Sequence, residues 1–119
     1  MQKQSLSLVV VIMFAAAFML PDEAHSQSIA LATKGRAKAV VVIPENAPHP
    51  VQFAAGEVKE YLDKITGADF RVVTDVPKAG PAILLGEKLG RQAGIDVNTV
   101  KRDGFIIKTV GERIYIAGK

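Results

Sequence analysis

The sequence predicts an α+β protein, a two-layer sandwich in which a mixed β-sheet of about five strands carries one long helix on one face. Three observations favour this class. Short β-branched segments alternate with clusters of turn residues. The segment 51–66 has the apolar periodicity of an amphipathic helix. The chain has 119 residues, which is enough for one domain and not for two.

The first half of the domain contains a buried strand and the long helix. Ala39–Ile43 is a continuous run dominated by β-branched residues, which is typical of a strand covered on both faces, and Pro44 ends it. Over 51–66 apolar residues recur with helical spacing and Gly67 follows as the C-terminal cap. The apolar positions of this predicted helix are Val51, Ala54, Ala55, Val58, Tyr61, Leu62 and Ile65.

The second half contains shorter elements. We expect strands over 70–74, 82–85, 105–110 and 113–117, and a short helix over 87–93 that Gly90 weakens. Gly111-Glu112 between the last two strands predicts a type II′ hairpin. The resulting order is β-α-β-β-(α)-β-β. Its first two strands are expected to be parallel, because a right-handed crossover through a helix joins them.

The N-terminus has the layout of a secretory signal peptide. Lys3 precedes the uncharged stretch Leu6–Leu20, and Ala24-His25-Ser26 places small residues at the positions that a signal peptidase requires. A membrane anchor is the rival interpretation, but a spanning helix needs about 20 apolar residues. We therefore expect a signal peptide over 1–26, a polar leader over 27–38 and a domain over 39–119. The product would be exported, either to a periplasm or out of the cell.

No catalytic, cofactor-binding or metal-binding residue is predicted. The chain has no cysteine, which excludes disulfides, cysteine-ligated metals and a thiol nucleophile. Glu57 and Glu60 lie one turn apart, but they share a polar helix face with lysines, and a solvated surface explains them. His49, between two prolines, is interpreted as a surface loop residue. The small basic excess, 15 Lys+Arg against 12 Asp+Glu, is spread along the chain, so nucleic acid is not an expected partner.

The sheet is expected to be only partly covered. A helix about 10 Å wide covers about two strands, because strands lie ~4.8 Å apart. Part of one sheet face should therefore be exposed or be covered by other polypeptide. From this we expect a domain that is truncated at its C-terminus or that needs a partner. The alternative is a complete small domain whose sheet is partly solvated.

Three blocks of sequence carry a family resemblance. They are 42–47 together with 53–68, then Ala82-Ile83-Leu84-Leu85-Gly86, then 103–107 together with 111–118. In this order they resemble the N-terminal domain of family 67 α-glucuronidases. They are also similar to the β-hexosaminidase-like second domain of family 20 glycoside hydrolases and to related secreted proteins.

The resemblance implies an α/β sandwich that packs beside a catalytic (β/α)₈ barrel following in the same polypeptide. It implies that the catalytic carboxylates lie on that barrel. The helix that follows the last strand in this family, and that covers the sheet, has no counterpart after Lys119.

The expected function is that of a non-catalytic accessory domain of an exported carbohydrate-degrading glycoside hydrolase, with glycan contact confined to its loops. An alternative is a stand-alone exported module that binds carbohydrate or protein. The aromatic residues weigh against a sugar-binding platform. The domain has no tryptophan, and Phe53, Tyr61, Phe70, Phe105 and Tyr115 are expected mostly on core faces. The identity of the sugar and of its linkage is not encoded in this chain.

Overall fold

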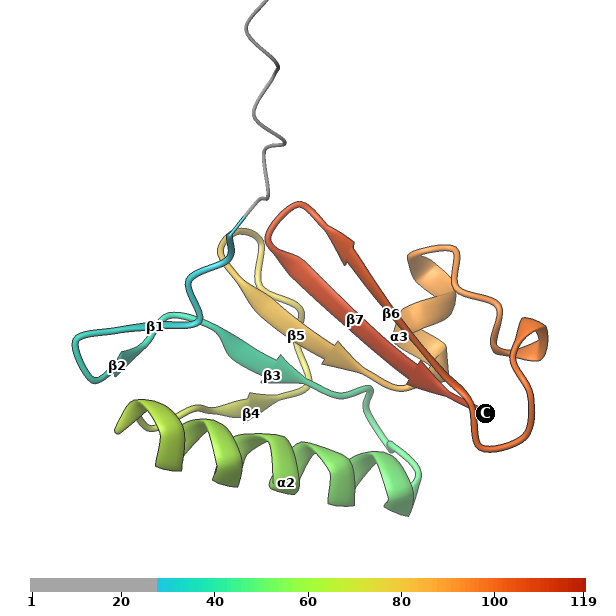
Figure 1. The fold of residues 1–119 in the computed structure, drawn as a ribbon, viewed down its shortest axis with the longest axis horizontal. Helices are drawn as coiled ribbons and strands as arrows, with labels where there is room; N and C mark the ends of the chain where they lie inside the picture. The colour runs from blue at the N-terminus through green and yellow to red at the C-terminus, as the bar shows by residue number, and fades with distance from the viewer. Residues whose placement is uncertain (1–27) are drawn as a thin grey trace, which may run out of the picture.

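The computed structural model describes residues 28–119, which form a mixed five-stranded sheet with one long helix (Figure 1). The strand order is β4-β3-β5-β7-β6, in which β6 alone is antiparallel to its neighbour. The bounds of these strands are β3 Val40–Val42, β4 Val72–Val73, β5 Ala82–Leu85, β6 Phe105–Val110 and β7 Arg113–Gly118. The α+β class and the mixed sheet are confirmed. The expected signal peptide over 1–26 lies outside the described residues.

Helix α2 spans His49–Thr66 and begins two residues earlier than the apolar periodicity predicts. Its start is set by proline, since Pro48 has the φ angle of −57° at the N-cap and a second proline follows in the first turn. Gly67 ends it in the left-handed conformation (φ 71°), and the Gly67 N–H donates to the Asp63 carbonyl. The apolar stripe of α2 packs on Val41, Ile83 and Leu85 of the sheet.

A second, smaller layer covers the opposite face of the sheet. Helix α3 (Glu87–Gln92) and the 3₁₀ helix η1 (Val97–Thr99) lie there, and Leu89 packs against Val42 and Leu84 (Figure 1). The expected two-layer sandwich is therefore wrong on this side, where α3 forms a local third layer. The approach of α3 is close because Gly90 carries no side chain: a Cβ at this position would lie 2.9 Å from the Cβ of Ala117.

The segment expected to be a polar leader is partly structured. Residues 32–37 form a hairpin of two short strands, β1 (Ala32–Thr33) and β2 (Arg36–Ala37). The turn between them has positive φ at both Lys34 (52°) and Gly35 (73°), as a type I′ turn requires. This hairpin is ordered by the core, because side chains on and beside it pack against the Phe70 cluster.

The hairpin between β6 and β7 agrees with its prediction. Val110 pairs with Arg113, which leaves a two-residue turn, and only the first turn residue, Gly111, has positive φ (59°). That combination defines a type II′ turn. The strand expected over 70–74 is shorter than predicted, with only Val72 and Val73 paired to β3.

Candidate functional site

The sheet has an uncovered apolar face beside α2. α2 packs mainly over β3, β4 and β5, so the same face of β7 and β6 has no helix over it (Figure 1). Phe105 and Ile107 on β6 are 66% and 58% exposed. Two apolar residues of α2 are also bare, with Tyr61 60% and Ile65 78% exposed. We call these four residues, together with the partly buried Ile116 of β7, the uncovered face.

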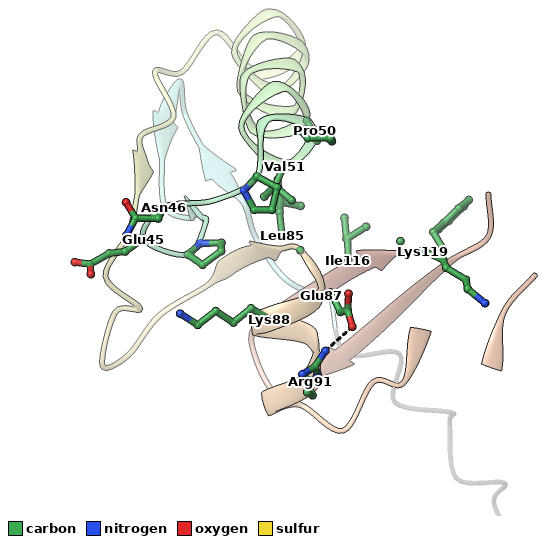
Figure 2. Close-up of a pocket in the computed structure, with 16 residues that line it drawn as sticks. Glu45, Asn46, Pro50, Val51, Leu85, Glu87, Lys88, Arg91, Ile116 and Lys119 are labelled. Carbon is green, nitrogen blue, oxygen red and sulfur yellow. Dashed lines mark hydrogen bonds and ion pairs between the residues drawn. The ribbon is translucent and has the colours of Figure 1, made fainter. Parts of the chain in front are cut away.

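One end of the uncovered face deepens into a pocket of about 820 Å³ at the carboxyl ends of β3, β5 and β7 (Figure 2). In open sheets with parallel strands, this edge is where ligands commonly bind. The first turn of α2 and the loop before it form one wall, which Pro44, Pro48 and Pro50 stiffen. The apolar lining comes from Val51, Ala54, Leu85, Phe105 and Ile116.

Charged groups stand at the rim of this pocket rather than in its apolar part. Arg91 donates to Glu87 across one turn of α3, so these two charges largely satisfy each other. Lys88, Glu45 and Lys119 complete the charged lining, and all three are exposed. Buried polar residues are absent among residues 28–119. The pocket is thus an apolar recess whose charged lining residues are exposed.

Glu57 and Glu60 do not form a reactive pair. Both lie on the solvent side of α2, and Glu60 accepts a hydrogen bond from Lys64 Nζ at 2.8 Å. The Glu60 carboxylate raises the pKa of Lys64 above its ordinary value. A glycosidase needs one carboxyl group in an apolar environment that holds its proton. The solvated-face interpretation of the two glutamates is the one that these contacts favour.

His49 is exposed, and it is the first residue of α2 rather than a loop residue. Ser28 is also exposed, at the start of the described chain. Within the described range, no three His, Asp or Glu side chains converge as metal ligands. No helix in residues 28–119 has the length and apolarity to cross a membrane.

The aromatic residues are distributed differently from the expectation. Among the aromatic residues of 28–119, only Phe70 is fully buried, and Tyr115 is partly buried. Phe53, Tyr61 and Phe105 are each at least 60% exposed. Helical periodicity places Tyr61 at the border of the apolar stripe, but no strand lies under that border. The expectation that the aromatic side chains lie mostly on core faces is therefore wrong.

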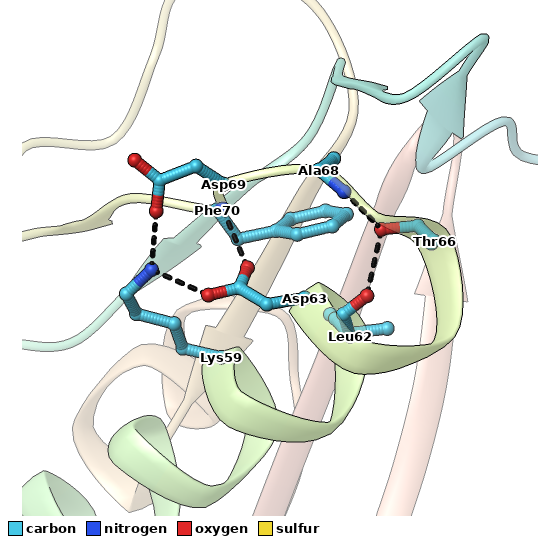
Figure 3. Close-up of polar contacts among 7 residues, drawn as sticks. All are labelled: Lys59, Leu62, Asp63, Thr66, Ala68, Asp69 and Phe70. Atoms are coloured by element: carbon cyan, nitrogen blue, oxygen red, sulfur yellow. Dashed lines mark hydrogen bonds and ion pairs between the residues drawn. The ribbon is translucent and has the colours of Figure 1, made fainter.

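A polar clasp holds the C-terminal half of α2 to the segment before β4 (Figure 3). Lys59 Nζ lies 2.7 Å from Asp63 Oδ2 and 2.6 Å from Asp69 Oδ1. The other oxygen of Asp63 accepts the backbone N–H of Phe70 at 2.7 Å. The Lys59 ammonium is the main cause that lowers the pKa of Asp63, and the Phe70 N–H adds to it. This clasp positions Phe70 as it enters the core, so its role is structural.

Replacing the clasp carboxylate, Asp63→Asn, is expected to lower the stability of the protein modestly at neutral pH. It is also expected to make that stability less dependent on pH in the acid range. A carboxyl group whose pKa is lower in the folded than in the unfolded chain stabilises the fold fully above its ordinary pKa of 3.8. That contribution is lost as the pH falls through the lower, folded-state pKa. Urea unfolding of both proteins at neutral and acid pH measures the effect.

The matched control is Asp69→Asn, because the Asp69 side chain shares Lys59 but is 91% exposed. An exposed ion pair contributes little. We expect the difference in the free energy of unfolding between the native protein and Asp63→Asn to become smaller as the pH falls. A difference that does not change with pH would contradict the role of the Asp63 charge.

Comparison with known proteins adds no assignment. No family model matches the sequence. No curated protein matches it at a significant level.

Proposed function

We propose that this chain is a non-catalytic accessory domain of an exported carbohydrate-degrading glycoside hydrolase. The observation that carries the proposal is the uncovered face, where Phe105, Ile107, Tyr61 and Ile65 are all more than half exposed. Large apolar side chains that stay exposed on one sheet face, as Phe105 and Ile107 do, are typical of a site of contact with other polypeptide. In this proposal the other polypeptide includes the (β/α)₈ barrel implied by the resemblance, and the sheet domain supports that barrel.

The placement of the charged residues favours a structural role for this domain over a catalytic role. The ion pairs of the described residues lie on the exposed faces of α2 and α3 or in the clasp. No carboxylate stands in the apolar part of the pocket, whose lining there consists of aliphatic and aromatic side chains. The apolar recess would receive a side chain or a helix end of the adjoining polypeptide.

The direct test is to read the gene downstream of the Lys119 codon and, where the frame continues, to express the longer product. The proposal expects a continuation that encodes repeated β/α units with glycosidase activity. In that longer product, Phe105→Asp should reduce thermal stability of the whole enzyme, because a charge would then be buried at the contact. A stop codon followed by an unrelated gene would count against the proposal.

The alternative, a stand-alone carbohydrate-binding module, gains one observation from the structure. Phe105 lines the pocket and is 66% exposed, so its ring is available to stack on a sugar. Retention of the protein on insoluble xylan or chitin tests this function. Phe105→Ala should abolish retention, whereas Phe53→Ala, which removes an equally exposed ring away from the pocket, should not. Absence of retention on either glycan would remove the alternative.

A further inference from the structure

Strand β6 is a long and unprotected sheet edge. It is six residues long, it pairs with β7 without a bulge, and it contains no proline. Five of its six side chains are exposed, and only Ile106 is partly buried. The opposite edge, β4, is only two residues long. Natural sheets usually shorten, kink or cover such edges, because an exposed apolar edge strand pairs with another chain.

The backbone groups that face outward from this edge can be identified from the neighbouring hydrogen bonds. Ala82 N–H donates to the Glu112 carbonyl and Gly86 N–H to the Ile116 carbonyl, so even-numbered residues of β7 face β5. The odd-numbered residues of β7 therefore face β6. Their partners on β6 are the even-numbered residues, from Ile106 to Val110. In an antiparallel ladder the intervening residues direct both backbone groups away from the partner strand. Within residues 28–119, the N–H and C=O groups of Phe105, Ile107 and Thr109 thus have no strand partner at this edge.

We propose that β6 pairs antiparallel with β6 of a second copy of this chain, with the two-fold axis at Ile107. In this register Ile107 lies opposite Ile107 of the second copy and Phe105 lies opposite Thr109. Each of the three outward residues then exchanges both backbone groups with an outward residue of the other copy. The product is a continuous sheet formed by both copies, with α2 on the same side in each.

The side chains favour this register over its neighbours. Lys108 lies opposite Ile106, so no like charges face each other across the axis. A shift that placed Lys108 opposite Lys108 would be destabilising. Lys108 is also drawn off the edge, because its Nζ donates to the Ala93 carbonyl at 2.7 Å. The remaining cross-strand pairs are aromatic with β-branched or β-branched with β-branched, which stabilise antiparallel strands.

A second copy also extends the uncovered face. Phe105 and Ile107 lie on the α2 side of β6, and the two-fold axis brings the corresponding residues of the second copy beside them. The two apolar rows then shield one another along the strand. The proposal concerns the edge of the sheet, and it does not rest on the proposed function or on what lies over the face.

Cysteine cross-linking of the full chain tests the register, since the sequence contains no cysteine. Ile107→Cys places two thiols opposite each other across the axis, at a Cα separation of about 5.5 Å, which a disulfide can span. Mild oxidation should convert this variant to a covalent dimer. Val110→Cys is the matched control. Its two copies would lie about 20 Å apart, at ~3.4 Å per residue, and should stay uncross-linked.

Sedimentation of the protein without cysteine tests the association itself. The average mass should rise with concentration towards that of a dimer and no further. Ile107→Lys should abolish this rise by placing two ammonium groups opposite each other, at little cost to the monomer because Ile107 is 58% exposed. Val72→Lys, on the other edge strand, should leave it unchanged. A monomer at every concentration, open-ended assembly, or equal cross-linking of both cysteine variants would overturn the proposal.

Discussion

Replacing Phe70 by alanine is expected to lower the free energy of unfolding by about 3–5 kcal/mol. Phe70 is fully buried, and it joins Ala39 and Ala68 in a cluster that also holds the β1–β2 hairpin and Leu62 of α2. Those neighbours come from two separate parts of the chain, 31–39 and 62–68, and the loss of the ring would leave a cavity between them. Small domains are stable by only about 5–15 kcal/mol, and this variant should therefore be close to unfolding.

Urea unfolding followed by far-UV circular dichroism measures this loss. The matched control is Phe105→Ala, because Phe105 is 66% exposed and most substitutions at such positions change stability by about 0.5 kcal/mol or less. Similar losses for the two variants would contradict the assignment of Phe70 to the core and of Phe105 to the uncovered face.

The sheet could be predicted from the sequence because its strands are short runs with an unambiguous pattern. Ala82–Leu85 is apolar throughout, and the structure buries all four residues between α2 and α3. Gly111 marks the turn of the last hairpin, and its positive φ confirms that turn. In such segments the local preference and the tertiary environment favour the same conformation.

The features of the fold that the sequence does not predict depend on tertiary contacts. The β1–β2 hairpin has strands of only two residues, which are not stable without the Phe70 cluster beneath them. Lys34-Gly35 was the only local signal for its turn, and lysine is not a residue that type I′ turns favour. The sheet face that α3 covers could not be predicted from the six residues of α3 either. Leu89 is the one apolar residue among them, and its contacts with the sheet decide which face α3 covers.

The sequence predicts that part of the sheet is uncovered, but it does not predict which residues form the candidate site. The widths of a helix and of a strand are fixed, so one long helix over a sheet of this size leaves strands bare. Which strands are bare depends on the strand order, and β7 lies next to β5 only because the last hairpin joins the sheet through its second strand. The exposed flank of α2, at Tyr61 and Ile65, follows from the same arrangement.

Substitutions of Gly90 are expected to destabilise the protein although they improve the helix that contains it. Alanine favours a helix over glycine by about 1 kcal/mol. At Gly90, however, a Cβ would lie 2.9 Å from the Cβ of Ala117, which is itself 1% exposed on the sheet. Overpacking of this kind typically costs 1–3 kcal/mol. We expect Gly90→Val to lower the free energy of unfolding by about 2–3 kcal/mol, and Gly90→Ala to lower it by less.

The sign of the stability change caused by Gly90→Ala shows whether packing or helix propensity dominates at this position. Gly56 is also a helical glycine, but it is exposed on α2 and a Cβ there would have nothing within 4 Å. Gly56→Ala should therefore stabilise the protein by about 0.5–1 kcal/mol, opposite in sign to Gly90→Ala. Adding Ala117→Gly to Gly90→Ala removes the other half of the clash, so the loss from the pair should be smaller than the sum of the two single losses. Chemical unfolding of the native protein, Gly90→Ala, Ala117→Gly and the double variant measures this coupling. Additive losses would show that α3 does not touch β7 at Gly90.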